Sequence, residues 1–160
     1  MKKVFFLFIL AGFLFSCQTE SKTEEIGKRF FEIYSKRKEV DKMVSFYAGN
    51  FQYENVNFRS EANDAKFLYE SFYNWSDPNF KFAGTETIKL ESLLTNDSTI
   101  VAKGITMPYQ YKGNQVEGTR FVIWLELDKD LKIKKQTDWF DYPMEEIIEA
   151  YQIKRNLEIE

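Results

Sequence analysis

The chain has 160 residues, of which 18% are aromatic, with a formal net charge of -3, one cysteine and no histidine. The acidic balance argues against a nucleic-acid partner, because nucleic acids attract basic surfaces. A lone cysteine can form no internal disulfide, and the absence of histidine removes the zinc, copper and non-haem iron sites that depend on imidazole. We therefore expect no metal site and no cofactor.

The N-terminus has the layout of a secretory signal peptide, in which two lysines precede an apolar run from Val4 to Phe15. This run is shorter than the roughly 20 residues that cross a bilayer, so a removed segment fits better than a retained anchor helix. Leu14-Phe15-Ser16-Cys17 resembles the bacterial lipobox. The resemblance implies cleavage before Cys17, lipidation of Cys17 and attachment to the cell envelope. Because Gln18 replaces the aspartate that favours the inner membrane, we expect the outer membrane.

The remaining chain is long enough for one domain. Removal of residues 1–16 takes away two lysines, so the net charge of the mature chain becomes -3 - 2 = -5. The stretch Gln18 to Glu25 has no apolar residue and predicts a lipidated, solvated tether over 17–25. The domain itself is expected over 26–155, followed by a C-terminal tail over 156–160.

Apolar residues at helical spacing predict three helices in the first half of the domain. They cover about residues 24–37, 40–49 and 61–75, with Tyr47 on the apolar stripe of the second. Asp77-Pro78 ends the third helix, because a residue before proline disfavours the helical conformation. The short aromatic segment Phe51 to Asn55 predicts a strand between the second helix and the third.

From Asn79 onward the pattern has a period of two residues, which is typical of strands. Turn residues at 95–98, 112–114 and 128–130 divide it into the long strands of an antiparallel meander. The last strand, from about Leu131 to Phe140, leads to Pro143, which we expect to be the first residue of a terminal helix. The order of elements predicts an α+β fold in which helices cover one face of a curved sheet.

This order resembles the NTF2-like superfamily, which includes SnoaL-like polyketide cyclases, ketosteroid isomerases, scytalone dehydratase and limonene epoxide hydrolase. Its most specific part is Lys132-Ile133 followed by Asp138-Trp139-Phe140-Asp141, which is similar to the ending of SnoaL-like chains. Leu131 stands where those chains usually have glycine. The resemblance implies an NTF2-like cone, a curved antiparallel sheet with helices packed on its concave face and a pocket between them.

The final strand separates two aspartates, because alternate side chains point to opposite faces. Gln136 and Asp138 share one face with Phe140, whereas Asp141 lies on the other, so the aspartates cannot act as a pair. Likeness to limonene epoxide hydrolase implies that Gln136 and Asp138 face the pocket. We expect Asp141 to hydrogen-bond the free amide groups at the start of the terminal helix.

Asp138 is the candidate catalytic residue. A carboxyl group enclosed by aromatic rings has its pKa raised, as a general acid or base near neutral pH requires. The alternative is an Asp138 that pairs with a hydroxyl or a lysine at a hydrated mouth of the cone. Tyr53 and Asn55 match, in type and spacing, the pair that holds a water in limonene epoxide hydrolase. The Arg-x-Asp pair that the same enzyme needs does not occur in this chain, so we do not expect that reaction.

Aromatic side chains supply the other ligand contacts that we expect, although ordinary core packing stays open for each: Tyr34, Tyr53, Tyr69, Phe72, Trp75 and Phe140.

The first hypothesis is a lipid-anchored protein that binds a small, partly apolar molecule without converting it. The second is an isomerase, dehydratase or cyclase with Asp138 as base and Tyr53 as the polarising hydroxyl. The third is an interaction module that forms a homodimer through Val122 and Trp124, because their face of the sheet would otherwise expose an apolar patch.

Overall fold

The computed structural model describes residues 21–157, without the side chains of residues 146, 149, 150, 153, 154, 156 and 157. The signal peptide and Cys17 lie outside the described residues. The helices are α1 (Lys22–Tyr34), α2 (Val40–Val44), α3 (Ala65–Phe67), the π-helix η1 (Leu68–Phe72) and α4 (Met144–Leu157). The strands are β1 (Tyr47–Asn55), β2 (Ser60–Ala62), β3 (Phe80–Phe82), β4 (Ile88–Thr95), β5 (Thr99–Thr106), β6 (Tyr109–Tyr111), β7 (Asn114–Val116), β8 (Arg120–Leu127) and β9 (Ile133–Phe140).

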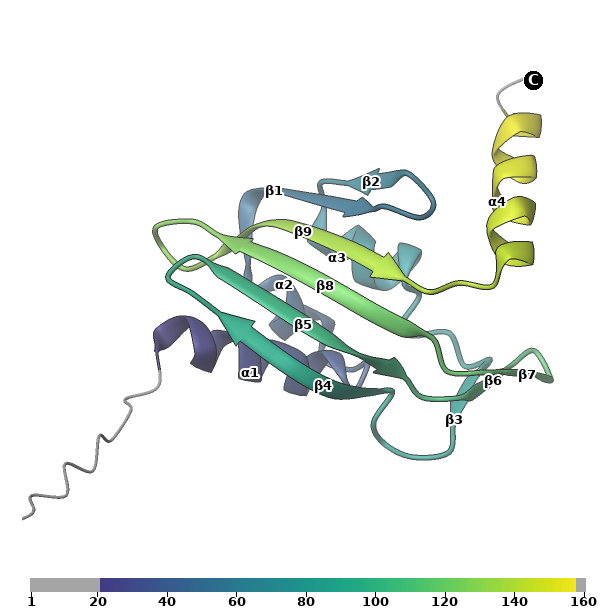
Figure 1. Ribbon diagram of the computed structural model, residues 1–160, viewed down its shortest axis with the longest axis horizontal. Coiled ribbons are helices and arrows are strands. Elements are labelled where there is room, and N and C mark those ends of the chain that lie inside the picture. Colours follow the sequence, from purple (N-terminus) through teal and green to yellow (C-terminus); the bar gives the residue numbers. More distant parts are fainter. Residues whose placement is uncertain (1–20, 158–160) are drawn as a thin grey trace, which may run out of the picture.

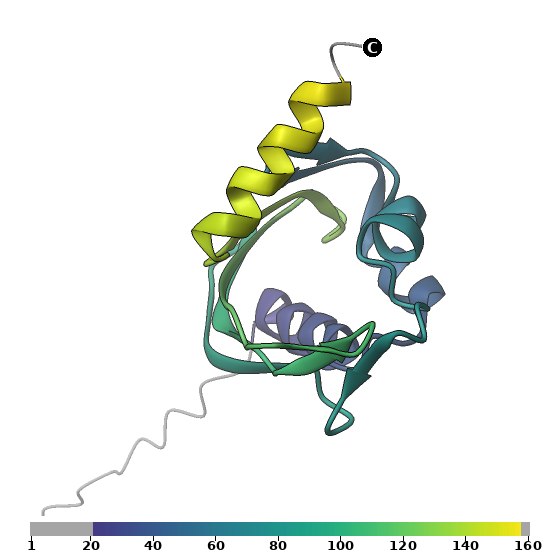
Figure 2. The ribbon, with the colours of Figure 1, turned by 90° about the vertical axis from the view of Figure 1, so that its right-hand side faces the viewer.

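A six-stranded sheet in the order β2-β1-β9-β8-β5-β4 forms the body of the molecule. It curves strongly, and α1, α2 and α3 lie on the concave side (Figures 1 and 2). This confirms the predicted α+β cone with helices on the concave face. Two features were not predicted. The strands β1 and β9 pair in parallel, and the short strands β3, β6 and β7 form a second sheet.

The core lies between the concave face and α1. On β8 the residues Phe121, Ile123, Leu125 and Leu127 are buried, as their alternation predicts. Facing them, α1 buries Phe30 and Phe31, and burial of such a side chain stabilises the fold by about 1.5–3 kcal/mol. The helix can approach β5 closely because Gly27 has no side chain: a Cβ there would lie 3.1 Å from Cγ2 of Ile100.

The first helix begins earlier than predicted, so residues 22–25 belong to α1 and not to the tether. The cause is a local hydrogen bond, in which the Ser21 hydroxyl accepts from the backbone amide of Glu24 at 3.1 Å. A serine followed three residues later by glutamate is a known helix-start pattern. Composition alone does not reveal this first turn of the helix, because the turn faces solvent on most sides and its residues are polar.

The second and third helices are shorter than predicted. Tyr47 is not helical but is the first residue of β1, because α2 ends at Val44. Residues 60–62 form β2 and pair with β1, so the third helix begins only after Asp64, whose carboxylate accepts from the amide of Phe67 at 3.0 Å. The chain then widens into η1, where the amide of Tyr73 donates to the carbonyl of Leu68 five residues earlier, at 2.8 Å.

The C-terminal part departs from expectation at Asp141 and Pro143. The first bond of α4 runs from the amide of Ile147 to the carbonyl of Pro143, so Pro143 precedes the helix instead of starting it. Asp141 lies two residues further back, where its carboxylate accepts from Nη2 of Arg120 at 2.6 Å. The expectation that it caps the helix was therefore wrong.

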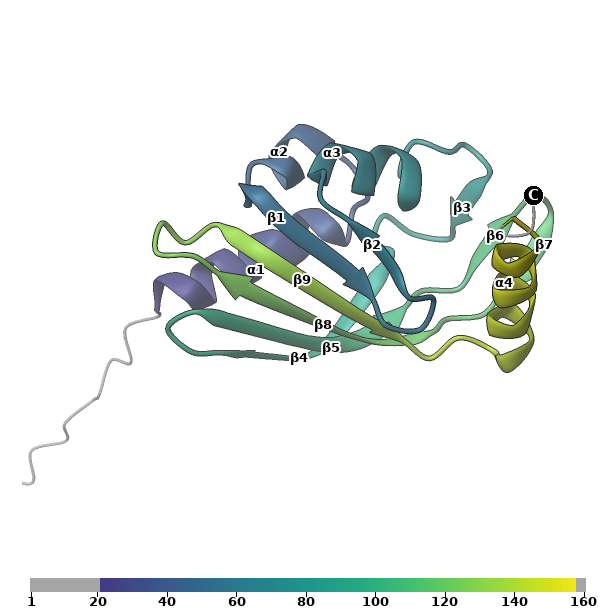
Figure 3. The ribbon, with the colours of Figure 1, turned by 90° about the horizontal axis from the view of Figure 1, so that it is seen from above.

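The helix α4 extends to Leu157, two residues beyond the expected end of the domain, and stands at one end of the sheet, away from α1 (Figure 3). Within residues 21–157, no helix is long and apolar enough to cross a membrane.

Candidate functional site

An aromatic cavity of about 310 Å³ lies at the open end of the cone. Its wall comes from the end of α1, the residues that follow η1, the small second sheet and the ends of β4, β5 and β9. Six phenylalanine and tryptophan rings dominate the wall, and tyrosines, threonines and one arginine supply its polar groups. The lining residues are Tyr34, Arg37, Phe58, Phe72, Tyr73, Trp75, Phe80, Phe82, Thr87, Ile88, Thr106, Tyr109, Thr119, Phe140 and Tyr142.

A buried carboxyl group, that of Asp138, lies behind this wall. Asp138 is 0% exposed, because it lies on the buried face of the inner strand β9, where its neighbour on β8 is the buried Ile123. The hydroxyl of Tyr73 donates to Oδ2 of Asp138, and Nε2 of Gln136 donates to Oδ1 at 3.0 Å. Burial raises the pKa of Asp138 to about 7, although hydrogen bonds from Tyr73, Gln136 and Tyr53 oppose the rise.

The polar groups around Asp138 form one connected network. The hydroxyl of Tyr47 donates to Oε1 of Gln136 at 2.5 Å, and its oxygen lies 2.5 Å from that of Tyr69. The hydroxyl oxygens of Tyr53 and Tyr73 are 3.3 Å apart. Burial raises the pKa of Tyr47, Tyr69 and Tyr73 well above the usual value, so these groups are neutral donors. Among the described side chains, the one buried polar atom without a partner is the hydroxyl of Ser60, which is not part of this network.

The position of Tyr73 is fixed by its backbone. The π-helix bond to Leu68 ends η1 at this residue, and Asn74 then takes a left-handed conformation with φ of 48°. The carbonyl of Tyr73 accepts from Nη2 of Arg37 at 2.7 Å. These constraints place the Tyr73 ring in the cavity wall while its hydroxyl meets Asp138, so the ring separates the carboxyl group from the cavity.

The structure divides the predicted site residues into two groups. Four line the cavity: Tyr34, Phe72, Trp75 and Phe140. The other five are at most 2% exposed and lie behind the wall: Tyr53, Asn55, Tyr69, Gln136 and Asp138. Asn55 accepts a hydrogen bond from the backbone amide of Phe58 at 3.2 Å, which closes the turn after β1. Direct ligand contact by these five residues stays a prediction.

Four of the fifteen lining residues were predicted and eleven were not, and Tyr73 and Arg37 are the two of these eleven that shape the site most. Tyr73 lies four residues after Tyr69, so helical spacing was compatible with the same face, but after Tyr69 we predicted only Phe72 and Trp75 in this segment as ligand contacts. Arg37 was treated as the end of the first helix. Neither sequence spacing nor composition indicates that the segment after α1 reaches the segment after η1.

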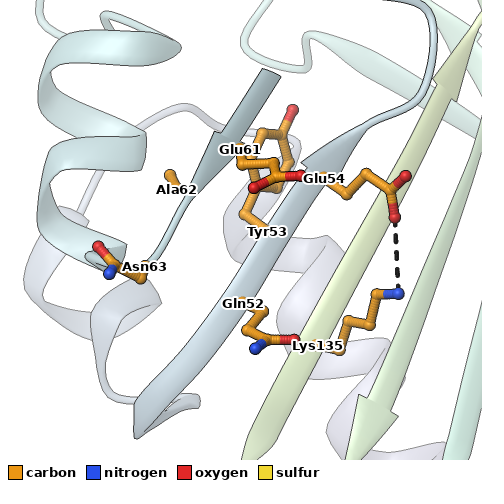
Figure 4. Close-up of a pocket in the computed structure, with 7 residues that line it drawn as sticks. All are labelled: Gln52, Tyr53, Glu54, Glu61, Ala62, Asn63 and Lys135. Atoms are coloured by element: carbon orange, nitrogen blue, oxygen red, sulfur yellow. Dashed lines mark ion pairs between the residues drawn. The ribbon is translucent and has the colours of Figure 1, made fainter. Parts of the chain in front are cut away.

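A second hollow, of about 560 Å³, is larger but is a polar surface groove on β1, β2 and β9 (Figure 4). Glu54 and Glu61 pair across the strands, and Glu54 forms an ion pair with Lys135 at 3.5 Å. These charged groups are solvated, and no apolar wall encloses the groove. Among the described residues, no group of three or more aspartate, glutamate or cysteine side chains could hold a metal ion. The aromatic cavity is therefore the candidate site.

Among the comparisons with known proteins, those of structure support the fold, whereas those of sequence find no match. The sequence matches no protein-family model and no curated protein. A protein from Shewanella denitrificans OS-217, named for its likeness to SnoaL polyketide cyclases, is 11% identical with a TM-score of 0.63, over 80% of this chain and 97% of its own. An NTF2-like protein from Burkholderia thailandensis E264 is 15% identical with a TM-score of 0.59, over 74% and 90%.

A third similar structure is an LEH-like epoxide hydrolase of M. tuberculosis, 13% identical with a TM-score of 0.58, over 80% of this chain and 87% of its own. Identities this low establish the shared architecture and not a shared reaction. The chain therefore has the NTF2-like fold.

Proposed function

We propose that the protein binds a small, partly apolar molecule in the aromatic cavity and does not convert it. The observation that carries this proposal is the separation of Asp138 from the cavity by Tyr73. Both oxygens of the carboxyl group already have donors within the protein, and the group is fully buried. The cavity, at about 310 Å³, lies at the lower end of the range for ligand pockets. Its wall offers aromatic surface and a few hydroxyl groups, which suit binding.

Native mass spectrometry of the protein purified from its own envelope tests this proposal. We expect a reproducible bound mass of a small molecule. Thr119 lines the cavity, so Thr119→Phe should fill the space and remove that mass. Thr99→Phe is the matched control, because Thr99 lies on the outer face of β5. A bound mass that survives Thr119→Phe, or a wild-type protein that carries none and binds none when offered envelope extracts, would contradict the proposal.

One observation favours the enzyme hypothesis as a second candidate: the hydrogen bond between Tyr73 and Asp138 links the cavity wall to a carboxyl group with pKa of about 7. In this alternative the Tyr73 hydroxyl gives its proton to Oδ2 of Asp138 and takes a proton from the bound molecule, so that Asp138 ends protonated and Tyr73 stays neutral. In this version Tyr73 takes the role first given to Tyr53, which does not line the cavity. Loss of turnover of the retained molecule in Asp138→Asn, with binding kept, would favour catalysis.

We propose further that Cys17 carries lipid and anchors the protein to the outer membrane. The support is the lipobox-like Leu14-Phe15-Ser16-Cys17 and the lack of any other cysteine. We expect the wild type in the outer-membrane fraction and Cys17→Ser outside it, because several acyl chains hold a protein far more firmly than one or none. Equal membrane retention of both proteins would overturn the lipid anchor.

Homodimerisation through the convex face is the remaining proposal. Trp124 is 42% exposed, Trp139 39% and Leu94 67%, and Trp124 lies beside Val101 in the sheet. A patch of this kind marks an interaction surface in many soluble proteins. We expect light scattering to give the mass of a dimer at micromolar concentration and Trp124→Glu to give a monomer. A monomeric wild type would rule the dimer out.

A further inference from the structure

Arg37 places a positive charge at the rim of the aromatic cavity. It follows α1 and lines both the cavity and an adjoining hollow of about 290 Å³. Its guanidinium lies 4.5 Å from the ring centroid of Phe80 and 5.9 Å from that of Phe82. Lys36 and Lys38 line the adjoining hollow as well. The approach to the cavity is therefore basic, although the protein as a whole is acidic.

The side chain of Arg37 is held in place by hydrogen bonds that occupy only some of its N–H donors. Of the five N–H donors of a guanidinium, two serve the carbonyls of Tyr73 and Asn74, which leaves three without a partner among the described residues. The backbone of Arg37 is left-handed, with φ of 48°. This conformation is uncommon outside glycine, so the position keeps a large side chain at a conformational cost.

Arg37 forms no ion pair with an aspartate or glutamate within residues 21–157. Asp77 shares the adjoining hollow, but burial lowers the pKa of Arg37 more than the negative charge of Asp77 raises it. The Asp77 carboxylate takes its hydrogen bonds from the amide and side chain of Asn79, at 2.9 and 2.7 Å, and not from Arg37. Lys36 is already paired with Glu32 at 2.9 Å. An unpaired, half-buried guanidinium beside aromatic rings favours a ligand that brings its own negative charge.

We propose that the cavity binds an organic carboxylate, with its apolar body among the aromatic rings and its acidic group on Arg37. The planar fork of a guanidinium matches the two oxygens of a carboxylate. This arrangement fixes the orientation of the ligand, because its apolar body enters the aromatic part of the cavity and its charged group stays at the basic rim. This inference rests on the proposed function, since it names the class of ligand that the same cavity takes.

Isothermal titration calorimetry with two probes tests the inference on the full-length chain. The probes are 2-naphthoate and its neutral isostere 2-naphthamide. We expect the wild type to bind 2-naphthoate about tenfold more tightly, because hydrogen bonds to a charged group are the stronger ones. Arg37→Met should remove that preference and leave 2-naphthamide binding nearly unchanged. Lys89→Met is the matched control: it removes one exposed charge from the outer face of β4 and should keep the preference.

The outcomes separate this inference from the proposed function. Equal binding of both probes by the wild type would overturn the carboxylate site and leave the cavity as a neutral binding site. Binding of neither probe would overturn the carboxylate site, whereas the retained mass and its loss in Thr119→Phe decide the proposed function separately. If Arg37→Met does not fold, as judged by circular dichroism, the wild-type comparison still decides, and Arg37→Lys, which keeps the charge but loses the fork, should retain only part of the preference.

Discussion

The free energy of unfolding is expected to fall by about 2–3 kcal/mol between pH 5 and pH 8, because burial raises the pKa of Asp138 from 3.8 to about 7. Between these two values the folded protein binds a proton that the unfolded chain has already lost. Raising the pH through this window therefore destabilises the folded state. Below about pH 4 the carboxyl group is protonated in both states, and the destabilisation disappears.

Urea denaturation at pH 5, 6, 7 and 8 measures this effect with little interference from other titrating groups, because the chain has no histidine. Asp138→Asn is the matching variant, since the amide has the shape of the carboxyl group and does not titrate. We expect its stability to stay almost constant over the same range. A wild type without the fall, or a variant that shows the same fall, would mean that Asp138 has an ordinary pKa.

Much of the fold could be predicted from the sequence, because long strands carry a strong period-two signal. The turns at 95–98 and 128–130 join β4 to β5 and β8 to β9. The alternation along the last strand separated Asp138 from Asp141, and the likeness to limonene epoxide hydrolase implied that Asp138 points inward, where the structure shows it buried. Short elements were less predictable: β2, β3, β6 and β7 have three residues each, which is too few for a period to emerge.

The site was predicted only in part, because its geometry depends on contacts between distant segments. The pattern of the third helix identified Phe72, and its irregular π-turn brings Tyr73 to Asp138. A side chain 65 positions away therefore decides whether the carboxyl group meets the cavity. Arg37 reaches the same segment through the carbonyl of Tyr73, and no local pattern records such a contact.

The Tyr73 hydroxyl gives the second large expected effect. Tyr73→Phe should lower the free energy of unfolding by about 2–3 kcal/mol at pH 8, where Asp138 is ionised, because a hydrogen bond to a charged group is lost. The loss should be about 1 kcal/mol at pH 5, where the carboxyl group is protonated and the bond is an ordinary one. Without this donor the pKa of Asp138 should rise further, since the Tyr73 bond is the strongest of those that lower it.

Tyr53→Phe is the control within the same network. The hydrogen bond of Tyr53 contributes least among the groups that lower the pKa of Asp138, and its hydroxyl oxygen lies 3.3 Å from that of Tyr73. We expect it to cost less than about 1 kcal/mol at either pH. Urea denaturation of both variants at pH 5 and pH 8 makes the comparison. If Tyr73→Phe costs the same at both pH values, its hydroxyl does not stabilise an ionised Asp138, and a proton path from the cavity through Tyr73 loses its physical basis.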